Sequence, residues 1–165
     1  MSSADIMLKL AKGREAEVED LDATVRREID ALLIESKGKL GSGDKFGALQ
    51  DAAGAWAKLP EPKFGWDVSK SFAHALAKIY RDAGEFQSAI ALMNQLFASQ
   101  TVKPYQDGPR FVMATIYFEM GDNASAMKWF DEANQISKGR CFKDEDKKYQ
   151  AFHKDMRQRK SGEAS

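Results

Sequence analysis

The sequence contains little of what builds disulfide frameworks, metal centres or membrane spans. Cys141 is the only cysteine in 165 residues, so no disulfide can form within the chain, which fits a reducing cytosol. The two histidines, His74 and His153, are far apart, and no histidine–cysteine spacing suits a zinc site. No apolar run approaches the roughly 18 residues of a membrane-spanning helix. We therefore expect a cytoplasmic protein that binds no metal and no cofactor.

The chain also lacks an excess of either charge and the motifs of common enzymes. Lys plus Arg total 25 and Asp plus Glu total 25, so no general positive charge is available to neutralise nucleic-acid phosphates. Residues 1–13 contain no basic stretch followed by a long apolar one, so we expect no secretory signal. Gly38, Gly41 and Gly43 lack the preceding strand that a phosphate-binding loop needs. We expect neither an enzyme nor a protein that binds nucleic acid or a membrane.

What the sequence does contain is the composition of one globular domain. Hydrophobic residues make up 43% and charged residues 30%, which are ordinary values for a soluble domain. The length is sufficient for one domain with a sizeable core. We expect a single helical domain over residues 1–160, followed by a disordered tail over residues 161–165.

One pattern occurs twice in the middle of the chain. Residues 79–97 (IYRDAGEFQSAIALMNQLF) align without a gap on residues 116–134 (IYFEMGDNASAMKWFDEAN), at an offset of 37 residues. A period of about 20–50 residues indicates stacked supersecondary units. Apolar residues have helical spacing on both sides of Gly84 and Gly121, and glycine ends a helix without a Cβ penalty. Each copy is therefore predicted to form a helix, a tight turn and a second helix.

These copies resemble the tetratricopeptide repeat, a helical hairpin with large and small residues at fixed offsets. The second copy matches it at Met113, Ala114, Tyr117, Gly121, Ala126, Phe130 and Ala133. The first copy matches it at Leu76, Ala77, Tyr80, Gly84 and Ala89. A weaker third copy lies upstream, at Gly43, Ala48, Ala52, Ala55 and Pro60. The resemblance implies an all-α, helical-hairpin solenoid of about three helix pairs, in which the first helix of each pair lines a concave groove.

The remaining segments complete this expected fold. Apolar spacing predicts a long amphipathic N-terminal helix over residues 18–36, with acidic residues in its early turns. Three glycines and a serine predict an irregular loop over residues 38–46, and a helix is expected over residues 45–58. The two further helix pairs are expected over about 68–98 and 107–137.

A last helix is expected at the C-terminal end of the stack. It should begin near Asp144 and end at Lys160, with Tyr149, Phe152 and Met156 facing inward and polar residues elsewhere. That pattern is typical of a terminal capping helix. Phe64 and Trp66, in the proline-containing segment before the first full repeat, are expected to cover the side of the stack.

The resemblance also implies where a partner would bind. The exposed groove positions would be Asp30, Leu33, Lys37, Ser71, His74, Lys78, Arg81, Phe111, Thr115 and Phe118. The basic residues among them share one helical face, and the two phenylalanines share another. The alternative interpretation is that the phenylalanines belong to the core and the basic residues are merely solvated.

An acidic segment offers a second candidate surface. It consists of Glu15, Glu17, Glu19, Asp20 and Asp22. Such a run could bind a basic partner, although the plainer interpretation is a solvated helix face.

A narrower resemblance covers roughly residues 39–154. Its marks are the turn LPEPKF before Trp66 and the acidic-Lys-Tyr-x-x-Phe pattern within residues 144–152. These residues look like those of small bacterial tetratricopeptide proteins encoded beside polymorphic toxins of the Rhs and contact-dependent-inhibition type, which are thought to act as immunity partners. The resemblance implies a protein that binds and neutralises a cognate toxin domain. The alternative is a repeat adaptor or secretion chaperone that binds a peptide or an effector.

Overall fold

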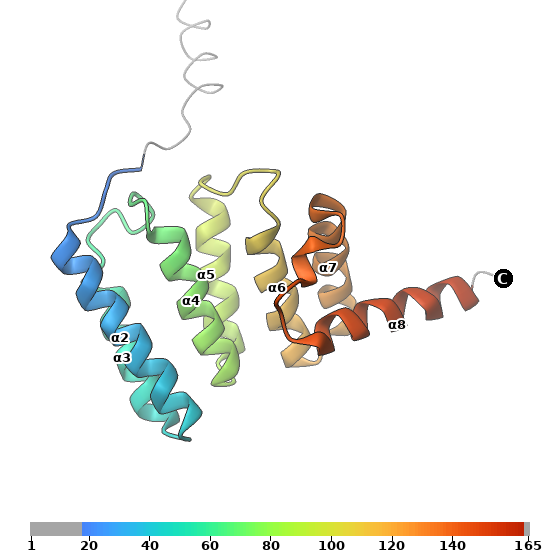
Figure 1. Ribbon diagram of the computed structural model, residues 1–165, viewed down its shortest axis with the longest axis horizontal. Helices are drawn as coiled ribbons and strands as arrows, with labels where there is room; N and C mark the ends of the chain where they lie inside the picture. Colours follow the sequence, from blue (N-terminus) through green and yellow to red (C-terminus); the bar gives the residue numbers. More distant parts are fainter. Residues whose placement is uncertain (1–17, 164–165) are drawn as a thin grey trace, which may run out of the picture.

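Three glycines with left-handed backbone mark the turns of three helical hairpins. In the computed structural model, which describes residues 18–163, Gly43, Gly84 and Gly121 have φ angles of +90°, +81° and +86°. The hairpins pair α2 (Ala23–Gly41) with α3 (Lys45–Lys58), α4 (Ser69–Asp82) with α5 (Phe86–Ala98), and α6 (Asp107–Met120) with α7 (Asn123–Ser137). The short 3-10 helix η1 (Arg140–Phe142) and the long α8 (Lys147–Glu163) follow (Figure 1).

The expectation of an all-α fold built from helical hairpins is confirmed. Between residues 18 and 163 there is no β-strand, and the only extended pairing is a single bridge between Glu19 and Trp66. None of the helices in this part of the chain is long and apolar enough to cross a membrane.

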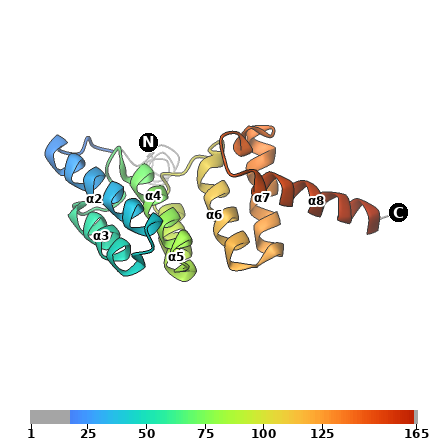
Figure 2. The same cartoon turned by 60° about the horizontal axis from the view of Figure 1, so that its bottom comes forward.

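The hairpins stack so that their first helices follow one another in a row (Figure 2). The first helices contact each other along the row, α2 with α4 and α4 with α6. The helices α4 and α6 also contact the second helix of the hairpin before them, which is α3 for α4 and α5 for α6. Beyond the third hairpin, α8 runs away from the stack past α7 (Figure 2). The row formed by α2, α4 and α6 is therefore one continuous face, and α8 lies at one end of it.

Small side chains allow the helices of a hairpin to approach closely. Ala48, Ala89 and Ala126 each follow a turn glycine by five residues, and all three are completely buried. Leu76 and Met93 lie in the same hydrophobic cluster as Ala89, and Phe130 lies in the same cluster as Ala126. The repeated alanines therefore mark the points where a larger side chain would push the paired helices apart.

This packing predicts the effect of enlarging one of these alanines. Ala126→Leu should lower the free energy of unfolding by about 1–3 kcal/mol, because extra methylene groups in a filled core force side chains and backbone to shift. Urea denaturation would measure the change. Ala124→Leu, at an exposed position of the same helix, is the control and should change stability little. Equal stability of the two variants would contradict the packing described here.

The N-terminal helix begins later than predicted. The carboxylate of Asp22 accepts hydrogen bonds from the backbone N–H groups of Thr24 (2.9 Å) and Val25 (3.1 Å), so α2 begins at Ala23. The preceding residues are extended and bound to the loop before α4. Glu19 N–H donates to the Gly65 carbonyl, and its own carbonyl accepts from Asp67 N–H, both at 2.8 Å. The prediction that the helix begins at Val18 is therefore wrong.

The same helix also ends later than predicted. It continues through Gly38 and reaches Gly41, so an irregular loop over residues 38–46 is wrong and the turn occupies only residues 42–44. Glycine lowers helix stability by about 1 kcal/mol per residue. Here, Leu40 packs against the core and Lys39 forms a 2.7 Å ion pair with Asp51 of α3, and both contacts hold the last turns of α2 in place.

The C-terminal helix differs from the prediction at both ends. It begins at Lys147 rather than Asp144, because η1 precedes it and Asp144 has a left-handed φ of +64°. It ends at Glu163, so residues 161–163 are helical rather than part of a disordered tail, and residues 164–165 lie outside the described residues. Tyr149 is buried and Phe152 and Met156 are half-buried, as expected for an inward face.

Candidate functional site

The face of α6 is covered by the C-terminal segment. Phe111 is 4% exposed, and its ring makes edge-on contacts with Phe130 (5.5 Å between centroids), Phe142 (5.5 Å) and Tyr149 (5.9 Å). Phe118 makes similar contacts with Tyr149 and with Phe152 of α8. These rings, with the half-buried Trp129 beside them, form a second hydrophobic cluster, which we call the aromatic cap.

Several predicted groove positions are therefore not on the surface. Phe111 and Thr115 are buried at the aromatic cap and along α6, and Leu33 is buried between α2 and the core, so the expectation that these three are exposed is wrong. For Phe111, the physical reason is that Phe142 of η1 and Tyr149 in the first turn of α8 pack against it, which the repeat pattern by itself does not indicate. Leu33 belongs to the hydrophobic core of the first two hairpins, and the Thr115 hydroxyl is bound by Arg81 and the Val112 carbonyl. Phe118 is half-buried. For Phe111, the alternative interpretation as a core residue is correct.

Arg81 is used to join two hairpins. Its guanidinium donates a 2.8 Å hydrogen bond to the Thr115 hydroxyl, which itself donates to the Val112 carbonyl at 2.7 Å. Its Nε donates to the Asp82 carboxylate at 2.7 Å, and only 11% of the side chain is exposed. Arg81 therefore links α4 to α6 and presents little of its charge to solvent.

The predicted positions that remain accessible lie on α2 and α4, and we call them the α2–α4 face. This face comprises Asp30, Lys37 and Ser71, which are exposed, and His74 and Lys78, which are half-buried. It is a mixed polar surface on two adjacent first helices. The face is bordered by the largely buried Arg81 and by the aromatic cap.

His74 contributes no positive charge to this face at neutral pH. Burial of the ring, together with the charges of Lys78 and Lys70, lowers the pKa of His74 from 6.5 to about 4. Its Nε2 atom is buried and has no hydrogen-bond partner among the described residues. The ring packs against the start of α6, since a Cβ atom at Gly108 would lie 3.5 Å from His74 Cε1.

The acidic segment is not the early part of a helix. Glu19, Asp20 and Asp22 are exposed, but they lie in the extended stretch and at the cap before α2. Glu15 and Glu17 lie outside the described residues. The expectation that the acidic run occupies the first turns of a helix is therefore wrong for the residues that the structure describes.

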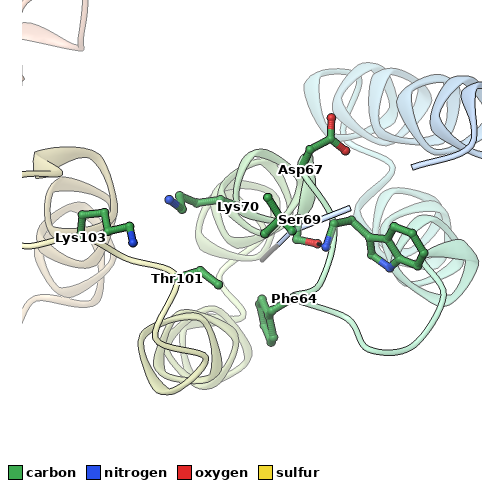
Figure 3. A pocket seen from close by; sticks show the side chains of 8 residues that line it. Phe64, Asp67, Ser69, Lys70, Thr101 and Lys103 are labelled. Carbon is green, nitrogen blue, oxygen red and sulfur yellow. Dashed lines mark hydrogen bonds between the residues drawn. The ribbon is translucent and has the colours of Figure 1, made fainter. Parts of the chain in front are cut away.

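Sequence reasoning missed a pocket at the loop edge of the stack (Figure 3). Its volume is about 190 Å³, and it opens between the loop before α4 and the connector between α5 and α6. Its labelled lining residues are Phe64, Asp67, Ser69, Lys70, Thr101 and Lys103. The only sequence signals were the length of the connector and its lysine, and neither indicates that Lys70 and Lys103 line one pocket.

Comparison with known proteins identified no relative of this chain. No family model matches this chain, and no curated protein or solved structure matches it. Among residues 18–163, no group of three or more His, Cys, Asp or Glu side chains is arranged to hold a metal ion.

Proposed function

We propose that this protein is a tetratricopeptide-like module that binds a protein partner through the α2–α4 face. The observation that carries this proposal is the contrast along the row of first helices. The α6 part of the row is covered by η1 and α8, whereas Asp30, Lys37 and Ser71 on α2 and α4 are exposed. A binding surface of limited extent, bounded by the buried aromatic cap, suits one specific partner.

We propose further that the partner is a cognate toxin domain, so that the protein acts in immunity. The support is the resemblance of residues 59–66 and 144–152 to small immunity proteins. In the structure, both segments have structural roles. Trp66 Nε1 donates to the Pro60 carbonyl at 2.8 Å within the first, and Tyr149 of the second donates to Glu119 at 2.9 Å. The resemblance thus concerns the scaffold, and the α2–α4 face is where the choice of partner would be made.

The proposed binding of a partner to the α2–α4 face can be tested by reversing the charges on this face. Lys37 and Lys78 are the accessible cations of the face, whereas Arg81 is unsuitable for a binding test because its removal would break the link between α4 and α6. Lys37→Glu combined with Lys78→Glu should weaken the complex by about 2 kcal/mol, roughly 30-fold, since charge reversal at an interface replaces attraction by repulsion. The candidate partner for this test is the product of the neighbouring gene, co-expressed and then purified for calorimetry.

Two further variants distinguish binding through the α2–α4 face from binding through other surfaces. Lys128→Glu reverses an exposed lysine on α7, away from the face, and should bind as the wild type does. Glu19→Lys with Asp20→Lys tests the acidic segment. If that pair abolishes binding while the Lys37/Lys78 variant binds normally, the α2–α4 face is the wrong surface. If the wild type neither binds the product nor protects cells from it, the immunity role fails and an adaptor for another partner replaces it.

A further inference from the structure

A groove lies between α7 and the part of α8 that continues beyond the stack, at the end of the molecule away from α2 (Figure 2). Two pockets form this groove, with volumes of about 450 Å³ and about 400 Å³. Both pockets are lined by Asn134 of α7 and Arg157 of α8, so they meet at these two residues. We call the two pockets together the α7–α8 groove, and it is separate from the α2–α4 face.

The α7–α8 groove is apolar at its deepest points and open to solvent along α8. Met127 of α7 and Phe142 of η1 line it and are buried. The lining residues Lys154, Arg157 and Lys160 of α8 are all exposed. A small-molecule site encloses most of its ligand, whereas a groove with one open side can admit a chain that continues at both ends. The shape therefore suits a segment of polypeptide.

Positive charge in the groove is not balanced within the protein. Lys154, Arg157 and Lys160 follow each other at intervals of three residues, so they lie along one side of α8. Within residues 18–163, none of these three forms an ion pair, whereas Arg159, which lines neither pocket, is paired with Asp155 at 3.2 Å. The groove therefore offers three cationic side chains to a ligand.

One carboxylate also lines the groove, and it is already bound. Asp131 of α7 accepts a hydrogen bond from Nε2 of the buried His153 at 2.8 Å, since an ionised carboxylate can only accept. The three cations of α8 therefore outnumber the negative charge beside them. A ligand that brings further carboxylates would complement this surface.

The other polar lining residues carry carboxamide groups. They are Asn134 and Gln135 on α7 and Gln150 and Gln158 on α8. None of these side chains makes a hydrogen bond to another residue in the range 18–163. A carboxamide has both donors and an acceptor, which are the groups that pair with the N–H and C=O of a peptide backbone.

We propose that the α7–α8 groove binds an acidic peptide segment of a protein partner in an extended conformation. Its carboxylates would lie beside Lys154, Arg157 and Lys160, where charge-assisted hydrogen bonds are stronger than neutral ones and the arginine can bind a carboxylate through two donors. Its extended backbone keeps N–H and C=O groups available to the carboxamides. The site goes beyond the proposed function, because it involves neither the α2–α4 face nor the toxin assignment.

Charge also explains why a protein segment is favoured over nucleic acid. Binding to a phosphate backbone needs a broad excess of positive charge, whereas Lys plus Arg and Asp plus Glu both total 25 in this chain. The groove itself contains Asp131, which would repel a continuous row of phosphates. An acidic peptide can place its carboxylates only beside the cations.

An NMR titration of the full chain tests this proposal. The probe is a capped synthetic peptide in which glutamate and alanine alternate, and the control peptide has glutamine in place of each glutamate. At constant ionic strength, we expect saturable amide shifts within residues 131–135 and 150–161 with the glutamate peptide alone. Absence of saturation, or equal binding of the glutamine peptide, would overturn the proposal. Tighter binding of single-stranded oligothymidylate to the same residues would also overturn it, in favour of a phosphate-binding groove.

Two matched variants test whether position on α8 matters as well as charge. Arg157→Gln should weaken binding of the glutamate peptide by about threefold, because it removes a charged donor from the groove. Arg159→Gln removes the same charge from the same helix but outside the groove, and should leave the affinity unchanged. Equal affinities of these two variants would contradict binding in the groove.

A combined variant tests the whole cationic row. Lys154→Gln, Arg157→Gln and Lys160→Gln together should weaken binding by about tenfold or more. All three residues are exposed, and circular dichroism would confirm that the helices are retained. A combined variant that is folded and binds the glutamate peptide as tightly as the wild type does would overturn the proposal.

Discussion

Replacing Phe130 with alanine should lower the free energy of unfolding by about 3–5 kcal/mol, the largest loss expected from a single change in this chain. Phe130 is completely buried in α7 and contacts Phe111, Phe142, Tyr149 and Phe152. Its removal leaves a cavity at the point where the third hairpin, η1 and α8 converge. Urea denaturation followed by circular dichroism would measure the loss.

Phe46→Ala is the matched control for this measurement. Phe46 has the same side chain but is 73% exposed at the start of α3, so its truncation should change stability by no more than about 0.5 kcal/mol. If the two variants were equally stable, the aromatic cap would not contribute to the fold as described.

Acidification should destabilise the protein through His74. Its pKa is about 4 when folded and 6.5 in the unfolded chain, so the unfolded state binds the proton more readily. The contribution of neutral His74 is thus complete above pH 6.5 and is lost as the pH falls from 6.5 toward 4. The free energy of unfolding should drop by about 2–3 kcal/mol between pH 7 and pH 4.5 from this residue alone.

The variant His74→Leu isolates this effect from other titrating groups. Leucine fills the half-buried site without a proton to bind, so the variant should lose less stability on acidification than the wild type does. Carboxylates titrate in both proteins and cancel in the comparison. Denaturation curves of the two proteins at pH 7 and pH 4.5 provide the measurement. Parallel losses of stability would show that His74 is accessible to protons in the folded state.

The repeat pattern was sufficient to predict most helix boundaries. The predicted helix over residues 45–58 coincides with α3, and Gly84 and Gly121 end the first helices of their hairpins. These predictions succeed because turn glycines and buried alanines are local requirements of a helical hairpin. The prediction was wrong for Gly38 and Gly41, where the Lys39–Asp51 ion pair and the packing of Leu40 outweigh the low helix propensity of glycine.

The binding surface was harder to predict than the helices. Helical spacing places Phe111 and His74 at corresponding positions of successive repeats, but only the fold shows that Tyr149 and Phe142 cover Phe111. The partnership of Arg81 with Thr115 is equally invisible in the sequence, since the two residues are 34 positions apart. The pocket near Lys70 depends on the path of the connector, which Gln106 holds because its side-chain oxygen accepts hydrogen bonds from Lys70 Nζ and from the backbone N–H of Lys103. Long-range packing decides which members of a repeated pattern reach solvent.

The position of Cys141 gives this protein an intrinsic reporter. The thiol is buried in η1 beneath the aromatic cap, its backbone N–H donates to the Ser137 hydroxyl at 3.0 Å, and burial raises its pKa. Because thiolates react and buried thiols do not, alkylation requires η1 to open. As Cys141 is the only cysteine, the labelling rate of the unmodified protein records how often its C-terminal end detaches, with no background from another thiol. Labelling that is faster than global unfolding would therefore report opening of that one end while the first two hairpins remain folded.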